Sequence, residues 1–239
     1  MMRNLLILLT LTFSTFVQAQ SDDNSIVIME LFTSQGCSSC PPADELLDVI
    51  KEEHKNNNVF VLSYHVDYWN RLGWKDPFST VEFSDYQRDY AKQFNSRSIY
   101  TPQLVVNGSE HFTGSNSTKA SVAIRNYSKS KTTNTIKLTN IERDNDVIKI
   151  EYGVEGNEFD QITFALVVSE RITKIGRGEN RNKTLKNTNI VASRLVTSDL
   201  SKSITLLVPD WIGDRDELAI IAYTQNNKLI TTGATKINI

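Results

Sequence analysis

The 239-residue chain has two cysteines, Cys37 and Cys40, and they stand between two different secondary-structure patterns. An apolar run at residues 26–32 precedes them, and apolar residues recur at helical spacing over residues 43–50. Residues 59–66 are again almost continuously apolar, as expected of a strand that helices cover on both faces. The order therefore predicts a strand, a turn, a helix and a second strand, which together form a βαβ unit.

The rest of the first half continues this alternation. A loop with two tryptophans spans residues 67–78, and Ser79 or Thr80 caps a predicted helix that runs to about residue 95. Thr101-Pro102 then precedes a short strand, a hairpin turn at residues 107–108, a return strand and a last helix over about 117–128. The predicted order of elements is β-α-β-α-β-β-α.

The pattern changes beyond a polar linker at residues 129–134. Short strand-like runs follow one another without a clear helix between them, and a long polar stretch at 174–189 is expected to be an extended loop. We therefore predict an α/β domain over residues 20–130 and a mainly β, sandwich-like domain over residues 131–239. The strand-like runs are residues 136–141, 147–154, 161–169, 190–196, 203–208, 218–224 and 229–237.

The N-terminal residues have the features of a cleaved signal peptide. A short basic start precedes a mostly apolar stretch over residues 5–17, and Val17 and Ala19 occupy the positions that a signal peptidase reads. This stretch is too short for a membrane-spanning helix, and no later one is long enough. Residues 1–19 are therefore predicted to be a signal peptide, and the mature protein to be secreted or periplasmic, without stable membrane insertion. Such a compartment is oxidising, so a cysteine pair can persist there as a disulfide.

The charge balance argues against some partners. The chain has 26 Lys and Arg against 28 Asp and Glu, a formal net charge of −2, and no long basic cluster. Nucleic acid is therefore not an expected partner. No apolar strip indicates self-association, so a monomer is expected.

The two cysteines are too few for a disulfide-stapled scaffold or a four-thiolate zinc site, so they must act as one pair. A Cys-x-x-Cys pair between a strand and a helix is typical of redox chemistry, because the helix N-terminus favours a thiolate. Cys37, expected to be the more exposed thiol, is then the nucleophile and Cys40 the resolving thiol. Pro41 and Pro42 place the helix start near Pro42, which weakens the dipole effect at Cys37. The alternative is a purely structural disulfide.

These residues resemble a known superfamily. Cys37-Ser38-Ser39-Cys40 after the first strand, and Thr101-Pro102 before a later one, are similar to the two signatures of the thioredoxin superfamily. The resemblance implies a thioredoxin-like α/β N-terminal domain, a cis Pro102, and a substrate chain held by Pro102 and the backbone of Thr101. Thioredoxins and strongly oxidising relatives carry other residues between the cysteines, so Ser38-Ser39 leaves the direction of electron flow open.

A narrower resemblance covers most of the mature chain. It is to a bacterial family of secreted thioredoxin-like proteins that is catalogued mainly as a domain of unknown function. The similar stretches are residues 30–44, 65–69, 73–78, 178–180 and 222–234. This resemblance implies a fold more than a reaction.

Four other side chains are candidates for the site. His65 and Asp67 follow the second strand, where the carboxyl ends of strands face a ligand crevice, so they are candidate proton carriers for the thiols. The alternative is a hydrogen-bonded histidine at a buried strand end and an aspartate that caps the next loop. Trp69 and Trp74 are candidates for lining a peptide groove, or they fill the core of their own loop.

The function predicted from these residues is an exported thiol-disulfide oxidoreductase. It would act on protein or small-molecule thiols and disulfides, with an unknown redox partner and no cofactor. One alternative is an exported metal-handling protein in which Cys37, Cys40 and His65 bind copper or zinc. The other is a non-enzymatic binding module, in which the cysteines form a structural disulfide and the β domain binds a partner.

Overall fold

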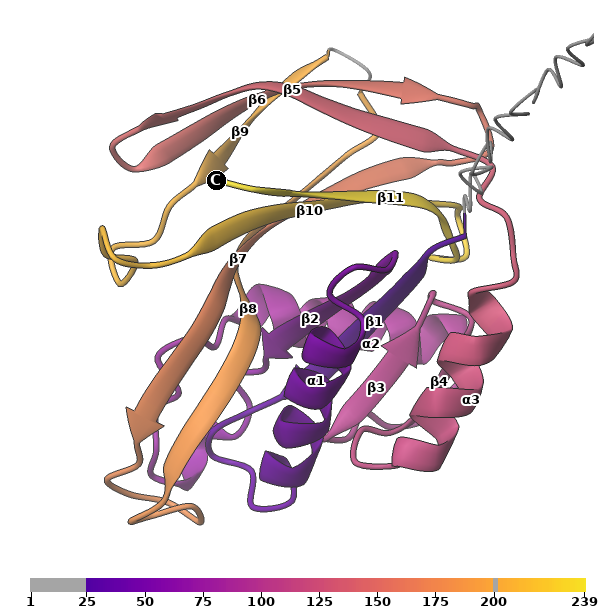
Figure 1. Ribbon diagram of the computed structural model, residues 1–239. Coiled ribbons are helices and arrows are strands. Elements are labelled where there is room, and N and C mark those ends of the chain that lie inside the picture. The colour runs from indigo at the N-terminus through magenta and orange to yellow at the C-terminus, as the bar shows by residue number, and fades with distance from the viewer. Residues whose placement is uncertain (1–24, 200–201) are drawn as a thin grey trace, which may run out of the picture.

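The computed structural model describes residues 25–199 and 202–239, and in these residues it has eleven strands, three α-helices and one 3-10 helix. The predicted signal peptide lies outside the described residues. Figure 1 shows the arrangement. The elements are β1 (Val27–Thr33), α1 (Pro41–Glu53), β2 (Val59–His65), η1 (Asn70–Leu72), α2 (Val81–Gln93), β3 (Gln103–Val106), β4 (Glu110–Thr113), α3 (Ser117–Tyr127), β5 (Thr135–Asp144), β6 (Val147–Glu155), β7 (Gln161–Lys174), β8 (Thr184–Thr197), β9 (Ser203–Leu207), β10 (Leu218–Gln225) and β11 (Thr231–Asn238).

The order of elements in the first half is the predicted one. Thr80 caps α2 as expected, because its hydroxyl accepts a hydrogen bond from the Phe83 amide. α1 and α3 pack on one face of β1, and α2 packs on the other. All seven residues of β1 are buried for this reason.

The predicted fold class, a thioredoxin-like α/β domain followed by a β-sandwich-like domain, is wrong. Strands of both halves form one mixed eight-stranded sheet in the order β11-β10-β7-β8-β2-β1-β3-β4. β1 pairs in parallel with β2, and β2 pairs in parallel with β8 through Ser63 and Ile190. The described chain is mostly strand, with no separate N-terminal α/β domain.

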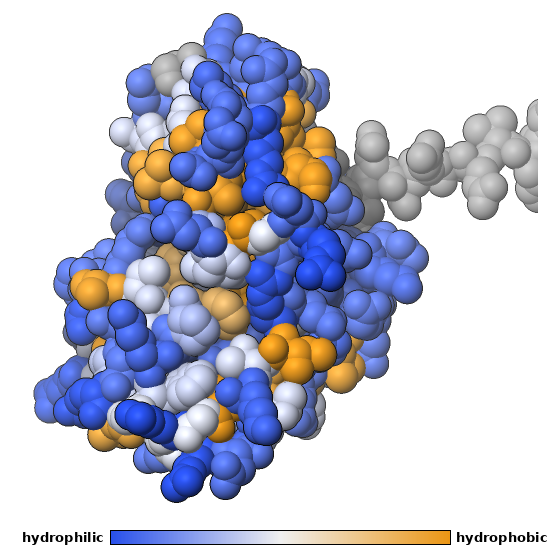
Figure 2. All heavy atoms as spheres, turned by 90° about the vertical axis from the view of Figure 1, so that its left-hand side faces the viewer, coloured by the Kyte–Doolittle hydropathy of each residue, from blue (hydrophilic) through white to orange (hydrophobic). Residues whose placement is uncertain are grey.

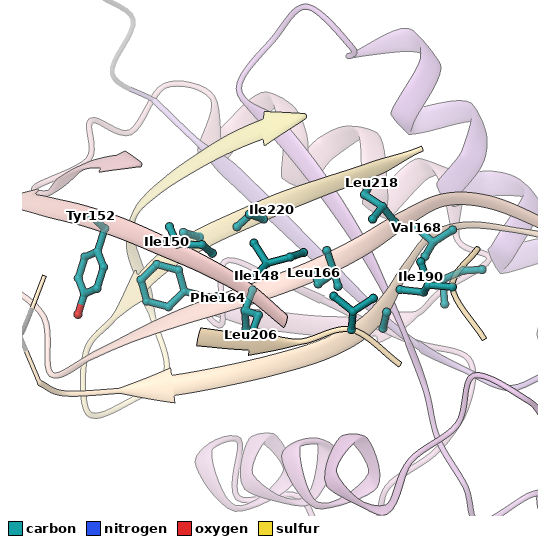
Figure 3. Close-up of a cluster of buried hydrophobic side chains, with 14 of the residues drawn as sticks. Ile148, Ile150, Tyr152, Phe164, Leu166, Val168, Ile190, Leu206, Leu218 and Ile220 are labelled. Atoms are coloured by element: carbon teal, nitrogen blue, oxygen red, sulfur yellow. The ribbon is translucent and has the colours of Figure 1, made fainter. Parts of the chain in front are cut away.

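The reason lies in strands of the second half that are buried on both faces. Residues 162–168 of β7 and all of β10 are buried. A sandwich strand alternates between a buried and an exposed face, whereas these strands need cover on both faces. One face packs against the three-stranded antiparallel sheet β5-β6-β9, as Figure 3 shows, and the other joins the core that contains α2.

A buried polar cluster also ties the two halves together. Glu30 of β1 is 0% exposed and accepts hydrogen bonds from Tyr86 (2.9 Å), Tyr223 (2.8 Å) and Tyr90. Arg194 of β8 lies with its guanidinium 3.8 Å from the centroid of the Tyr86 ring. Burial raises the pKa of Glu30. Because these groups come from β1, α2, β8 and β10, the contacts fix the two halves against each other.

The prediction of an extended loop over residues 174–189 is also wrong. β7 extends to Lys174 and β8 begins at Thr184, so the strands of a long hairpin enter this stretch from both ends and residues 175–183 form its tip. In Figure 1 the outer half of this hairpin runs beside α1. Lys51 of α1 joins them by donating to Ser169 O (2.9 Å) and Thr188 Oγ1 (3.0 Å). From there the hairpin runs along α1 toward its start, where Asn180 of the tip donates to Cys37 O (2.8 Å).

The surface on the hairpin side is mixed. Figure 2 shows apolar side chains gathered mainly in the upper half of this face, at the level of the two packed sheets, with polar side chains over most of the rest. Leu207 at the end of β9 is 68% exposed. Among the helices of residues 25–199 and 202–239, none is long and apolar enough to span a membrane.

Candidate functional site

The two cysteines form a disulfide in the loop that connects β1 to α1. α1 begins at Pro41, and Cys40 precedes it with helical dihedrals (φ −78°, ψ −36°). Pro41 and Pro42 fit the first helical positions, where the missing amide hydrogens have no partner within the helix. The helix thus starts directly after Cys40, within one residue of the predicted start.

Both cysteines are buried, at 0% exposure, while Ser38 and Ser39 between them are exposed. The expectation that Cys37 is the more exposed thiol is therefore wrong. The cover comes from segments far away in the sequence. Thr101 donates a hydrogen bond to Cys37 Sγ (3.3 Å) from one side, and the tip of the β7–β8 hairpin covers the loop from another.

Two residues of the hairpin tip hold the cysteine loop. Asn180, 0% exposed, donates from Nδ2 to the carbonyl oxygens of Gln35 (2.9 Å) and Cys37 (2.8 Å). Glu179 accepts a hydrogen bond from the Ser38 amide (3.2 Å). Gly178 has a φ of +73°, and a Cβ there would lie 3.1 Å from Trp74 Cβ, so glycine is favoured at this close approach. Residues 178–180 are among the stretches that carry the narrower resemblance, but no pattern in the sequence indicates that they lie on the cysteines.

Replacing Asn180 with Ala is expected to expose the disulfide. The variant loses two buried hydrogen bonds, worth about 1 kcal/mol each, so the tip opens more often. Reduction of the disulfide by dithiothreitol should become faster by about thirtyfold, measured by alkylation of the released thiols over time. Arg181→Ala, an exposed neighbour, is the matched control. Equal reduction rates in the two variants would show that the tip does not limit access.

Thr101, Pro102 and Trp69 come together beside Cys37. The Thr101-Pro102 peptide bond is cis, which confirms that expectation. The Thr101 hydroxyl also accepts a hydrogen bond from Trp69 Nε1 (2.8 Å) while it donates to Cys37 Sγ. Trp69 is therefore linked to Cys37 through the Thr101 side chain.

Trp74 has a different place. Its Nε1 donates to Gln35 Oε1 (3.2 Å), and its side chain packs against Gly178 of the hairpin tip. Gln35 in turn donates to Asn187 Oδ1 of β8 (2.9 Å). Trp74 thus supports the loop that carries the cysteines. These contacts favour the alternative in which the side chain fills a local core over the one in which it lines a peptide groove.

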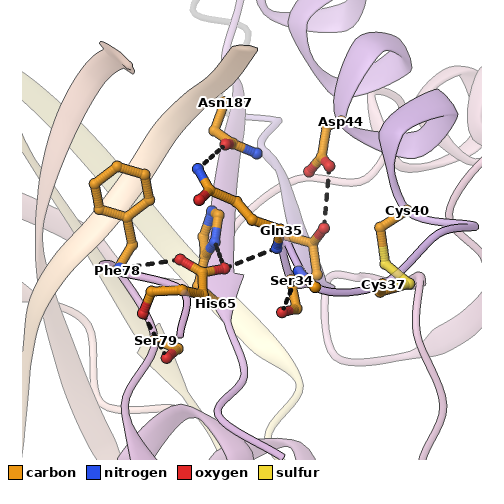
Figure 4. Close-up of polar contacts among 12 residues, drawn as sticks. Ser34, Gln35, Cys37, Cys40, Asp44, His65, Phe78, Ser79 and Asn187 are labelled. Atoms are coloured by element: carbon orange, nitrogen blue, oxygen red, sulfur yellow. Dashed lines mark hydrogen bonds and ion pairs between the residues drawn. A yellow bond between two sulfur atoms is a disulfide. The ribbon is translucent and has the colours of Figure 1, made fainter. Parts of the chain in front are cut away.

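His65 pairs with an aspartate that the sequence analysis did not select. Its Nδ1 lies 2.7 Å from Asp76 Oδ2, and both side chains are 0% exposed. Asp76 also accepts hydrogen bonds from the amides of Gln35 (2.8 Å) and Phe78 (3.0 Å). Figure 4 shows His65, Gln35 and Phe78 gathered around this site, with the cysteines to one side. Asp67 lies apart and accepts from the Ser84 hydroxyl of α2 (2.5 Å).

The electrostatics of this pair favour an ion pair. Burial alone lowers the pKa of His65, but the charge and hydrogen bond of Asp76 outweigh burial and raise it. Burial alone raises the pKa of Asp76, but the charge of His65 and the hydrogen bonds that Asp76 accepts lower it. The Asp76 carboxylate of this pair also binds the Gln35 amide, two residues before Cys37 in the chain. The pair therefore anchors the loop that carries the cysteines.

Asp44 of α1 is a further buried acid that the sequence analysis missed. It is 4% exposed, and its Oδ2 accepts a hydrogen bond from Thr33 Oγ1 (3.2 Å). Burial raises the pKa of Asp44 to about 7. A signal was present, because Asp44 lies on the apolar stripe of the helix with Ala43, Leu47 and Ile50.

The described residues do not bring a set of metal ligands together at the cysteines. Among residues 25–199 and 202–239, no group of three or more His, Cys, Asp or Glu side chains is placed to hold a metal ion. His65 uses Nδ1 for Asp76 and does not join the cysteines as a third ligand. The alternative of metal handling therefore has no support from these contacts.

Comparisons with known proteins give a family and a related structure. A profile of the family described as "Protein of unknown function (DUF1223)" matches residues 28–225. No curated protein sequence matches the chain. The crystal structure of a protein from Agrobacterium tumefaciens is similar, with a TM-score of 0.63 and 26% identity over 89% of this chain and 94% of that chain. A β-glucosidase from Kluyveromyces marxianus has a TM-score of 0.20 and 10% identity over 45% of this chain and 14% of that chain, too little to indicate a common fold.

Proposed function

This chain belongs to the DUF1223 family of proteins of unknown function, and from its site we propose that it is an exported thiol-disulfide oxidoreductase. The observation that carries the proposal is the disulfide at the start of α1 with the Thr101 hydroxyl on Cys37 Sγ. The cysteine pair and the cis Thr101-Pro102 bond are the two features that resemble the thioredoxin superfamily. Its substrates are protein or small-molecule thiols and disulfides.

Cys37 is assigned as the nucleophile because its sulfur has hydroxyl groups beside it. Thr101 Oγ1 donates to it, and Ser39 Oγ lies 3.4 Å away. Hydrogen bonds to a thiolate stabilise the charged form, and the N-terminus of α1 adds a favourable dipole. Cys40 is the resolving thiol. Thr101 and Pro102 hold the substrate chain, with Trp69 beside them.

The reaction is a disulfide exchange. The Cys37 thiolate attacks a substrate disulfide, one substrate thiolate leaves, and a mixed disulfide forms at Cys37. The Cys40 thiolate then attacks Cys37 Sγ, the Cys37–Cys40 bond forms, and the second substrate thiolate leaves. Two electrons pass from the protein dithiol to the substrate. The reverse sequence oxidises a substrate dithiol.

Replacing Cys40 with Ser is expected to trap substrates. The variant forms the mixed disulfide but has no thiol to resolve it, so partners should remain bound through Cys37 and be released by dithiothreitol. Non-reducing electrophoresis of the mature variant incubated with periplasmic or secreted proteins detects them. The matched control is the variant with both cysteines replaced by Ser. Equal recovery from the two variants would count against the assignment of Cys37.

A structural disulfide is the second candidate, and the burial of both cysteines favours it. The bond closes a very short loop, so its stabilisation is expected to be only about 1–2 kcal/mol. The reduction potential separates the two functions. A value between about −120 and −270 mV supports a redox catalyst, and a value below about −300 mV indicates a structural bond. Equilibration of the mature protein in glutathione and dithiothreitol buffers measures it.

A further inference from the structure

A second cavity lies between β8, the start of α2 and the end of β9, and none of its lining residues belongs to the cysteine site. Its volume is about 510 Å³, which is within the range of small-molecule sites. In Figure 1 the end of β9 lies on the left, and Figure 2 shows apolar side chains gathered at this level of the same face. The apolar residues of the lining are Phe83, Ala192, Leu195, Leu206, Leu207, Val208 and Pro209.

The basic side chain of this lining is Arg194 of β8, and it is buried with little to bind. The side chain is 9% exposed, and the guanidinium lies 3.8 Å from the centroid of the Tyr86 ring. Arg194 Nε has no hydrogen-bond partner among residues 25–199 and 202–239, and Nη1 lies 3.8 Å from Glu82 Oε1, beyond hydrogen-bond distance. A guanidinium keeps its charge even when it is buried, so its N–H donors need an acceptor.

Three carboxylates also line the cavity, but they lie at its rim. Asp146 and Asp210 are exposed, and the side chain of Glu82 is 54% exposed. Water and salt screen exposed charges, whereas the charge of the buried Arg194 is screened much less. A ligand with one negative charge is therefore attracted to Arg194, while a ligand with several negative charges is repelled by the rim.

We propose that this cavity binds a small monocarboxylic acid with an apolar chain, in the chemical class of a fatty acid. The ligand carboxylate accepts hydrogen bonds from the planar fork of the Arg194 guanidinium, the strongest arrangement for such a pair. The apolar chain packs against Leu207 and its apolar neighbours in the lining. Leu207 is 68% exposed, so the ligand removes this side chain from water. The site does not depend on the proposed oxidoreductase function.

Three probes with the same chain and different head groups test the ligand class. Isothermal titration calorimetry of the mature protein at neutral pH compares decanoate, decanol and decyltrimethylammonium. Decanoate should have a Kd about tenfold lower than decanol, because only the carboxylate forms charge-assisted hydrogen bonds with Arg194. Decyltrimethylammonium should bind more weakly than both, because its cation meets the guanidinium. Equal affinity for decanoate and decanol, tighter binding of the cation, or no binding of decanoate would overturn the proposal.

Replacing Arg194 with Lys places the ligand in the cavity. Lysine keeps the positive charge but lacks the planar fork, so the Kd for decanoate should rise by about tenfold. The matched control is Arg88→Lys, because Arg88 lies on the neighbouring α2 and pairs with Asp85 at the surface. Its Kd should equal that of the unmodified protein. Circular dichroism checks that both variants are folded.

Replacing Glu82 with Gln gives a second variant that does not disturb the interior. Glu82 is the carboxylate nearest to the guanidinium and competes with the ligand for it, so its loss should lower the Kd for decanoate by about threefold. If Arg194→Lys does not fold, this variant decides alone, and an unchanged Kd overturns the proposal. Unchanged affinity in both folded variants would mean that decanoate binds elsewhere on the protein.

Discussion

Replacing Asp76 with Ala is expected to lower the free energy of unfolding by about 3–5 kcal/mol, because it leaves a buried imidazolium without its partner. Asp76 accepts from His65 Nδ1 and from the amides of Gln35 and Phe78, and all of these groups are buried or nearly so. The substitution therefore removes three hydrogen bonds from one interior site. The loop that begins at Gln35 and carries Cys37 loses an anchor at the same time.

Urea unfolding near neutral pH measures this effect. The matched control is Asp67→Ala, which removes the half-buried aspartate that the sequence analysis had selected. Asp67 accepts from Ser84, so its loss should cost only about 1 kcal/mol. A cost for Asp76→Ala as small as for Asp67→Ala would show that His65 is neutral and needs no counter-ion. The double variant His65→Ala/Asp76→Ala should recover part of the loss, since no charge is left buried.

Asp44→Asn is expected to stabilise the protein above about pH 7, in contrast to Asp76→Ala. Burial raises the pKa of Asp44 from 3.8 in the unfolded chain to about 7 in the folded one. Between these values the folded state holds a proton that the unfolded state has lost, so stability falls as pH rises through this window. Above about 7 the loss is complete, and it amounts to at most about 4 kcal/mol.

Unfolding by urea at about pH 4, 6 and 8 tests the sign. The two proteins should differ by less than about 1 kcal/mol at the lowest pH, which is close to the unfolded pKa of 3.8, and the variant should gain its advantage as pH increases. Asp48→Asn is the matched control, because Asp48 lies one turn further on α1 and pairs with Lys186 (2.9 Å), so its loss should cost less than about 1 kcal/mol. Parallel curves for Asp44→Asn and the unmodified protein would mean that Asp44 is ionised and well solvated in the folded state.

Much of the local structure was predictable because it depends on neighbouring residues. Strand and helix periods placed the elements of the first half and the seven strands of the second, and Thr80 was recognisable as a helix cap. The spacing of Cys37 and Cys40 before a helix identified the disulfide, and the resemblance supplied the cis bond at Pro102.

The sequence by itself determined the elements, the cysteine pair and the residue types of the site. The tertiary structure alone decided that β8 joins β2 in one sheet, that Asn180 covers a cysteine loop 143 residues earlier, and that His65 pairs with Asp76. The physical reason is that hydrophobic periodicity says which face of a strand is buried but not which strand lies beside it. Which group a buried polar side chain binds depends on which segments pack together. A backbone carbonyl or a carboxylate accepts a hydrogen bond from any donor that packing brings within reach.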